Sequence, residues 1–88
     1  MYRIVYRKDS LKAIPKLKAA GLGKKTKVLI DILRDNPYQN PPPYEKLLGN
    51  LSGACSRRIN VQHRLVYQVL EEEKVVKIIS MWSHYENV

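Results

Sequence analysis

Three consecutive prolines at positions 41–43 divide this chain into two parts of different character. Proline has no backbone N–H and a fixed φ, so residues 37–44 can form neither a helix nor a central strand. They predict a stiff, extended connector. Helical patterns precede this connector and strand patterns follow it. The 88 residues allow a single domain, so we expect residues 1–88 to combine both parts in one fold.

The first part of the chain predicts a strand and then a helix. Residues Tyr2–Tyr6 are rich in β-formers and favour a strand. Asp9-Ser10 offers N-cap chemistry for a helix, and the apolar residues that follow fall three apart on one face: Leu11, Ile14 and Leu17. Pro15 removes a backbone donor and clashes with the preceding turn. The helix therefore either begins later than Ser10 or is bent.

A second helix is predicted from about Lys24 to Asp35. Gly21-Leu22-Gly23 ends the first helix, and Asn36-Pro37 stops the second. The apolar residues of this segment recur at helical spacing: Val28, Leu29, Ile32 and Leu33. We expect the two helices to form a hairpin whose outer surface carries lysines.

Three strands are predicted after the prolines, over Cys55–Asn60, Arg64–Leu70 and Val75–Trp82. The gaps between them are short enough for antiparallel hairpins. The order β-α-α-β-β-β predicts a small α+β fold, with an antiparallel sheet packed on the helical hairpin. The other face of the sheet would then be free to carry a site.

Alternation along the strand 64–70 separates two sets of side chains. Arg64, Val66 and Gln68 share one face, whereas Leu65, Tyr67 and Val69 share the other and are the predicted core set. In the preceding strand Arg57 and Arg58 point to opposite faces. At most one of these two arginines can therefore lie on the face of Arg64.

The formal net charge of +8 is concentrated in the first part of the chain. Residues 1–34 contain ten Lys or Arg and two acids, whereas residues 35–88 contain six of each. Such asymmetry indicates a polyanion or an acidic protein as partner. A helix face kept soluble by lysines is the alternative explanation, and the charge alone does not decide between them.

Composition excludes several classes of protein. Apolar residues make up 44% of the chain, too many for a disordered tail. Because no apolar run approaches the ~18 residues of a transmembrane span, we expect no membrane partner, and no signal peptide is recognised. Cys55 is the single cysteine, so no internal disulfide can form and a reducing cytoplasm is the expected compartment. We expect its side chain to be a small buried hydrophobic group. With His63 and His84 it forms no ligand spacing, so we expect neither a metal nor another cofactor.

A series of motifs in the second part of the chain suggests chemistry on RNA. The motifs are Tyr44-Glu45-Lys46-Leu47-Leu48-Gly49-Asn50-Leu51-Ser52-Gly53, Ser56-Arg57-Arg58-Ile59, His63-Arg64-Leu65-Val66-Tyr67 and Ser83-His84-Tyr85. A carboxylate, several arginines and a His-Tyr pair supply a proton acceptor, a cationic clamp and a proton donor. From Glu45 to Tyr85 the chain resembles the YoeB/Txe family of ribosome-dependent endoribonuclease toxins, within the RelE superfamily.

The resemblance implies a role for each matching residue. Glu45 matches the general base, Arg64 the phosphate-clamping arginine, His84 the general acid and Tyr85 the adjacent aromatic that helps to position the nucleotide. Arg58 is favoured as a second phosphate contact. The implied reaction is metal-independent attack of the RNA 2′-hydroxyl on the adjacent phosphate, which leaves a 2′,3′-cyclic phosphate or a 3′-phosphate.

Lysines complete the predicted site. Family members often carry a lysine three residues after the glutamate, where this chain has Leu48, so Lys46 is the neighbouring candidate for that charge. The basic first part of the chain supplies further predicted RNA contacts, namely Lys12, Lys16, Lys24 and Lys27. Trp82 either stacks on a base or packs at the end of the last strand, and His63 is expected to cap a hairpin or to be exposed.

The functional hypothesis is therefore a cytoplasmic mRNA interferase toxin of a type II toxin-antitoxin system, which inhibits translation on the ribosome. Its partners would be the ribosome, messenger RNA and a cognate antitoxin whose acidic segment folds on the basic surface. The sequence leaves the oligomeric state open, with a homodimer as one option. The main rival hypothesis is a non-catalytic RNA- or ribosome-binding module of the same fold. A gyrase-inhibiting relative is disfavoured, because such relatives lack the combined set of Glu45, Arg64, His84 and Tyr85.

Overall fold

The computed structural model describes residues 1–48 and 53–84, and for Ser83 and His84 it describes the backbone alone. The elements follow in the order β1 (Arg3–Tyr6), the 3₁₀ helix η1 (Lys8–Ala13), α1 (Ile14–Ala19), α2 (Gly23–Asp35), β2 (Glu45–Lys46), β3 (Ala54–Arg58), β4 (His63–Leu70), the 3₁₀ turn η3 (Glu71–Glu73) and β5 (Val75–His84). This order confirms the predicted α+β fold.

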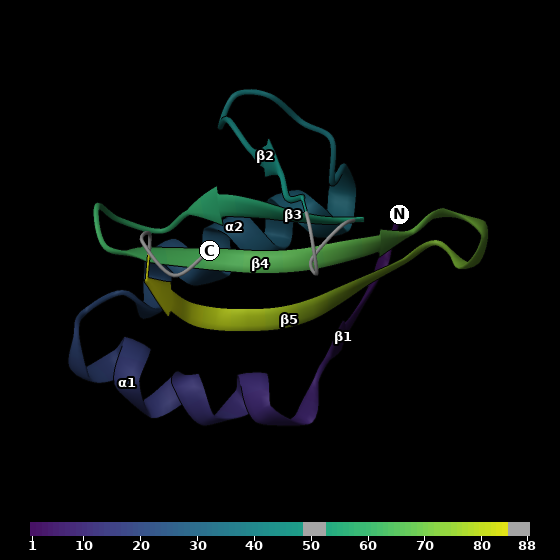
Figure 1. The fold of residues 1–88 in the computed structure, drawn as a ribbon. Coiled ribbons are helices and arrows are strands. Elements are labelled where there is room, and N and C mark those ends of the chain that lie inside the picture. The colour runs from purple at the N-terminus through teal and green to yellow at the C-terminus, as the bar shows by residue number, and fades with distance from the viewer. Residues whose placement is uncertain (49–52, 85–88) are drawn as a thin grey trace.

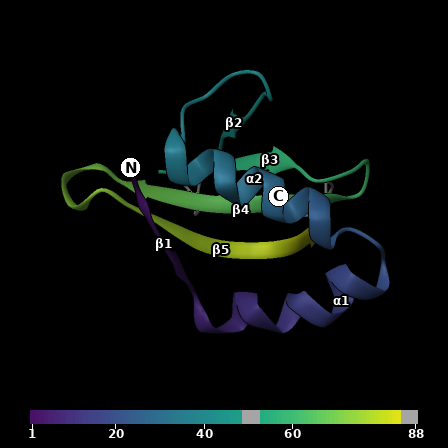
Figure 2. The same cartoon turned by 180° about the vertical axis from the view of Figure 1, so that it is seen from behind.

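The described strands form one sheet in the order β1-β5-β4-β3-β2. Figures 1 and 2 show α2 across one face of β3 and β4, and α1 alongside β5. The pairs β2–β3, β3–β4 and β4–β5 are antiparallel, and the last two were predicted as antiparallel hairpins. The first strand is not antiparallel, because β1 pairs with β5 in parallel, with Arg3 beside Val75. The expectation of a wholly antiparallel sheet was wrong at this edge, and the short strand β2 was not predicted.

Pro15 lies in the first turn of α1, where its missing N–H has no intrahelical partner to lose. The residues before it form η1, so the regular helix begins later than Ser10, one of the two predicted alternatives. Gly21 ends this segment with a φ of 72°, in the left-handed region that glycine adopts without strain. The second helix, α2, begins at Gly23 and ends at Asp35, one residue from its predicted start.

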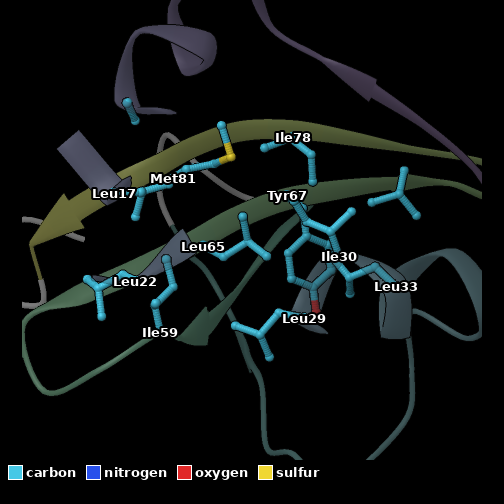
Figure 3. Packing of buried hydrophobic residues seen from close by; sticks show 12 residues of the cluster. Leu17, Leu22, Leu29, Ile30, Leu33, Ile59, Leu65, Tyr67, Ile78 and Met81 are labelled. Carbon is cyan, nitrogen blue, oxygen red and sulfur yellow. The ribbon is translucent and has the colours of Figure 1, made fainter. Parts of the chain in front are cut away.

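The core lies between the helices and one face of the sheet (Figure 3). Helix side chains pack there against side chains from β4 and β5, including Leu17, Leu29, Ile30 and Leu33 from the helices and Leu65, Tyr67, Ile78 and Met81 from the strands. Leu65 and Tyr67 are fully buried, which confirms the predicted core set of β4. Arg64 therefore belongs to the opposite set of side chains.

A carboxylate ties three distant segments together at the far end of the sheet. Glu71 accepts hydrogen bonds from the hydroxyls of Tyr2, at 2.9 and 2.8 Å, and of Tyr38, at 2.9 Å. It also accepts one from Lys74 Nζ at 2.6 Å. The hydrogen bond from Lys74, followed by those from the two tyrosines, lowers the pKa of Glu71 to about 2. This Glu71 cluster fastens β1 and the segment after α2 to the β4–β5 turn.

Candidate active site

Three neighbouring strands bring a carboxylate, a hydroxyl and an arginine together. Glu45 is the first residue of β2, and its Cα pairs with that of Ser56 on β3. Further along β3, Arg58 pairs with Arg64 on β4. Directly opposite residues of antiparallel strands share a face of the sheet. One face of the sheet, opposite to the face on which Leu65 and Tyr67 enter the core, therefore carries Glu45, Ser56, Arg58 and Arg64.

The guanidinium of Arg64 makes the central contacts of this group. Its Nη1 donates to Ser56 Oγ at 2.8 Å and lies 3.3 Å from Glu45 Oε2. The Arg64 side chain is only 6% exposed, whereas that of Glu45 is 62% exposed. Burying a cation costs several kcal/mol unless partners compensate, so the carboxylate and the hydroxyl are needed to hold Arg64 in place.

These side chains line a small depression, which we call the Glu45 hollow. It has a volume of about 210 Å³ and is lined by Pro43, Tyr44, Glu45, Ser56, Arg58 and Arg64. Two guanidinium groups and one carboxylate meet in a space of this size. Arginine forks match phosphate oxygens bidentately, and a carboxylate can accept a proton, so the arrangement suits a phosphodiester with a neighbouring hydroxyl.

Arg57 has a different task, which sequence reasoning missed. It is 1% exposed, and its donors reach the carbonyl oxygens of Pro37 (3.0 Å), Gln39 (2.8 Å) and Pro42 and the hydroxyl of Tyr67 (3.1 Å). Its guanidinium also lies 4.9 Å from the ring centroid of Tyr44. The prolines of this connector have no backbone N–H, and Arg57 supplies hydrogen bonds that fix its carbonyl oxygens. The connector in turn leads directly to Glu45.

The last strand brings the proposed acid near the same strands. Along β5 the backbone of Ser83 pairs with Arg64, and that of His84 pairs with His63. Position 84 therefore lies opposite the residue that precedes Arg64 on β4. Tyr85 lies outside the described residues, as do the atoms of the His84 side chain.

The structure separates the predicted lysines. Lys46 and the 87% exposed Leu48 line a different hollow, with Cys55, and neither lines the Glu45 hollow. Lys24 lies in a shallow groove that Arg58 also lines. Lys27 lies in a groove between the helices. Lys12 and Lys16 line a depression against β5, described below.

His63 is not exposed, so that alternative of the prediction was wrong. It is buried as the first residue of β4 and stacks on Trp82, with ring centroids 3.9 Å apart and an interplanar angle of 20°. The pairing of β4 with β5 places the two rings together. The alternation of each strand alone carries no signal for this contact.

The part of the chain that the structure describes contains neither a metal-ligand group nor a membrane-spanning helix. No group of three or more His, Cys, Asp or Glu side chains that could hold a metal ion occurs there. None of its helices has the length and apolar character needed to cross a membrane.

Comparisons with known proteins identify the family of this chain. A family model described as the YoeB-like toxin of bacterial type II toxin-antitoxin systems matches residues 15–85, a range that contains α2 and the strands β2 to β5. The chain belongs to this toxin family. Toxin YoeB of Synechocystis sp. is 40% identical over 63 residues, which are 72% of this chain and 71% of that protein. Toxin YoeB of Escherichia coli K12 is 42% identical over 53 residues, 60% of this chain and 63% of that one.

Solved structures of YoeB-like toxins share the fold. A YoeB/ParE toxin from Agrobacterium tumefaciens superposes with a TM-score of 0.83 at 27% identity, covering 94% of this chain and 99% of that one. The toxin in a heterotetrameric YoeB-YefM toxin-antitoxin complex from Staphylococcus aureus gives 0.78 at 31% identity, covering 97% and 99%. YafQ from E. coli, at 17% identity and a TM-score of 0.78, is similar in fold alone.

Proposed function

We propose that this YoeB-like toxin is a ribosome-dependent endoribonuclease that cleaves messenger RNA in the ribosomal A site and so inhibits translation in the cytoplasm. The observation that carries the proposal is the Glu45 hollow, in which a carboxylate lies 3.3 Å from a buried arginine with a second arginine beside it. A site for binding RNA alone gains nothing from a carboxylate next to the phosphate, because like charges repel.

In the proposed reaction Glu45 accepts the proton of the RNA 2′-hydroxyl while the 2′-oxygen attacks the adjacent phosphorus. A bond forms between this oxygen and phosphorus, and the bond from phosphorus to the 5′-oxygen of the next nucleotide breaks. The products are a 2′,3′-cyclic phosphate and a 5′-hydroxyl, and water can open the cyclic product to a 3′-phosphate. A positioned base of this kind contributes about 10²–10⁴-fold.

Arg64 and Arg58 hold the phosphate in this scheme. An incoming phosphate competes with Glu45 for the Arg64 guanidinium, since both are anions that accept from the same fork. Binding therefore frees the carboxylate to act as a base at the moment when the 2′-hydroxyl arrives. The two cations then stabilise the additional charge that develops on the phosphorane oxygens.

His84 donates the proton to the departing 5′-oxygen, and Tyr85 positions the nucleotide. An imidazole has an unperturbed pKa of about 6.5, which suits proton donation around neutral pH. These two assignments rest on the match to the family motif and on the place of position 84 opposite the start of β4.

Ribosomes programmed with a defined mRNA test the proposal. Purified wild-type protein should cut the mRNA at the A-site codon and leave 5′-hydroxyl ends, which polynucleotide kinase can label without prior phosphatase treatment. His84→Gln should slow this cleavage about 10²–10⁴-fold without lowering the melting temperature, because the proton donor is lost near the end of the chain. An intact mRNA after prolonged incubation with wild-type protein would refute the proposed function.

A cognate antitoxin completes the proposal. The relatives from S. aureus include a YoeB-YefM complex and a YoeB dimer, both at about 30% identity to this chain. We expect an acidic antitoxin segment to fold on the basic surface of residues 1–34, and a homodimer is the oligomer to test first. Co-expression with the antitoxin should abolish growth arrest, and light scattering should give the mass of a dimer for the free toxin.

A further inference from the structure

Besides the Glu45 hollow, the structure contains a depression between η1, the start of α1 and β5, which we call the Trp82 hollow. It has a volume of about 250 Å³, and its lining includes Asp9, Lys12, Lys16, Ser80 and Trp82. This volume is several times the roughly 30 Å³ share of one water molecule, so an aromatic base has room to enter.

Trp82 reaches this hollow from a fixed position. It is half-buried, packs against the core and stacks one face of its ring on His63. The stack restricts the orientation of the indole before any ligand arrives. A rigid, partly exposed aromatic ring is the element on which proteins stack the bases of single-stranded nucleic acids.

The charges at the rim complement this ring. Lys12 and Lys16 are exposed and come from η1 and α1, one turn apart. Asp9 is the acid of the rim, and its carboxylate lies 3.1 Å from Arg7 Nε, which balances its charge. The hollow therefore combines an aromatic surface with two amines that can meet a phosphate.

The Trp82 hollow also lies on the strand that leads to the proposed site. Trp82 is two residues before His84 on β5, and its stacking partner His63 precedes Arg64 on β4. We infer that the Trp82 hollow is a nucleotide subsite, in which one base of the RNA stacks on Trp82 while Lys12 and Lys16 bind the neighbouring phosphate. This inference rests on the proposed function and adds a second contact beyond the scissile phosphate.

Fluorescence provides a direct test, because Trp82 is the single tryptophan of the chain. A short single-stranded RNA with 2′-O-methyl groups cannot be cleaved by its own 2′-hydroxyls, so it serves as the probe. Stacking of a base should quench the Trp82 emission in a saturable way, and one abasic nucleotide at the right position should remove the quenching. Binding of the labelled RNA, seen by anisotropy, with unchanged tryptophan emission would overturn the inference.

Variants with a matched control locate the contact. Lys12→Ala with Lys16→Ala should weaken RNA binding, whereas Lys18→Ala with Lys25→Ala, at positions that do not line the Trp82 hollow, removes the same charge and should have a smaller effect. Trp82→Leu should cost about 5- to 150-fold in affinity, the range measured for stacking of one base. Trp82→Phe keeps an aromatic ring and should retain part of that affinity. The subsite would be contradicted if the two lysine double variants bound RNA equally well and if Trp82→Leu bound it as tightly as wild type.

Programmed ribosomes distinguish messenger RNA from ribosomal RNA as the source of the nucleotide. If the base belongs to the mRNA, an abasic mRNA nucleotide should slow cleavage by wild type and have no further effect on Trp82→Leu. If it belongs to ribosomal RNA, Trp82→Leu should lower ribosome affinity by the same factor with either mRNA. Unchanged cleavage and ribosome affinity of Trp82→Leu would overturn the subsite, whereas absence of wild-type cleavage would refute the proposed function itself.

Discussion

Adjacent arginines on one strand have unlike environments in this toxin. Arg57 is buried, and its hydrogen bonds hold the connector of residues 37–44, whereas Arg58 is exposed and lines the Glu45 hollow. The side-chain period of a strand is two, so neighbours always face opposite sides of the sheet. One arginine therefore serves the fold, and the other lines the hollow.

This difference predicts opposite effects of one substitution. Arg57→Ala should destabilise the protein by about 3 kcal/mol or more, because it leaves several buried oxygens without a donor. Arg58→Ala should change stability by less than about 0.5 kcal/mol, yet slow mRNA cleavage about 10-fold or more through the loss of a charged hydrogen bond. Thermal melting and single-turnover cleavage of both variants check this. A stable Arg57→Ala protein, or full activity of Arg58→Ala, would contradict the respective role.

The sequence predicted the faces of these residues and left their partners open. Alternation placed Leu65 and Tyr67 in the core and allowed only one of the two arginines beside Arg64, and both predictions agree with the structure. The carbonyl acceptors of Arg57 lie 15 to 20 residues away in the sequence. No local pattern encodes a contact at that distance, so it emerges only when the connector folds back on β3.

At the scale of elements, sequence reasoning succeeded where a signal was local. Glycine, proline and apolar spacing gave both helices and the three later strands to within a few residues. The edge that β1 occupies was not predictable in the same way. Its pairing with β5 joins residues about 70 apart in the chain, and a strand of four residues is compatible with either edge and either direction. The parallel pairing of β1 with β5 depends on how the helices that follow β1 pack against the sheet.

The Glu71 cluster, which fastens β1 to the β4–β5 turn, makes a prediction about pH. Its carboxylate has a pKa of about 2, below the ordinary 4.5, so the charged form is favoured in the folded protein. The resulting stability is fully present above about pH 4.5 and is lost as the pH falls towards about 2. The side chain is half exposed, so solvent screens the effect and we expect it to be modest.

Glu71→Gln isolates this contribution. The variant should melt at a lower temperature than wild type near pH 7, and the difference between the two should shrink between about pH 4.5 and pH 2. Melting curves of both proteins across this range provide the measurement. A difference that stays constant with pH would show that the charge of Glu71 does not stabilise the turn.

Across the whole molecule, the excess positive charge lies in residues 1–34, which precede Glu45 in the sequence. Lys12, Lys16, Lys24 and Lys27 lie around different hollows of that part, so they form a broad field and no single site. Such a field is suited to docking on a polyanion, since each cation that meets a phosphate releases counterions.

Reversal of these four lysines to glutamate should therefore weaken ribosome binding and make the remaining affinity less dependent on salt. Each lost phosphate contact should reduce the slope of log affinity against log salt by roughly 0.7 to 0.9. Equilibrium binding to ribosomes at several salt concentrations measures the slope, and melting curves control for folding. An unchanged slope would leave the lysines a role in solubility or in antitoxin binding.

The central claim for the molecule is that Glu45 makes it an enzyme rather than a module that only binds RNA. Glu45→Gln keeps the size of the side chain and an oxygen that can accept from Arg64, but it removes the base. We predict that this variant binds programmed ribosomes as tightly as wild type or more tightly, because a negative charge near the phosphate is lost. Single-turnover cleavage should be about 10²–10⁴-fold slower. Cleavage of the mRNA at the wild-type rate by Glu45→Gln would contradict the account.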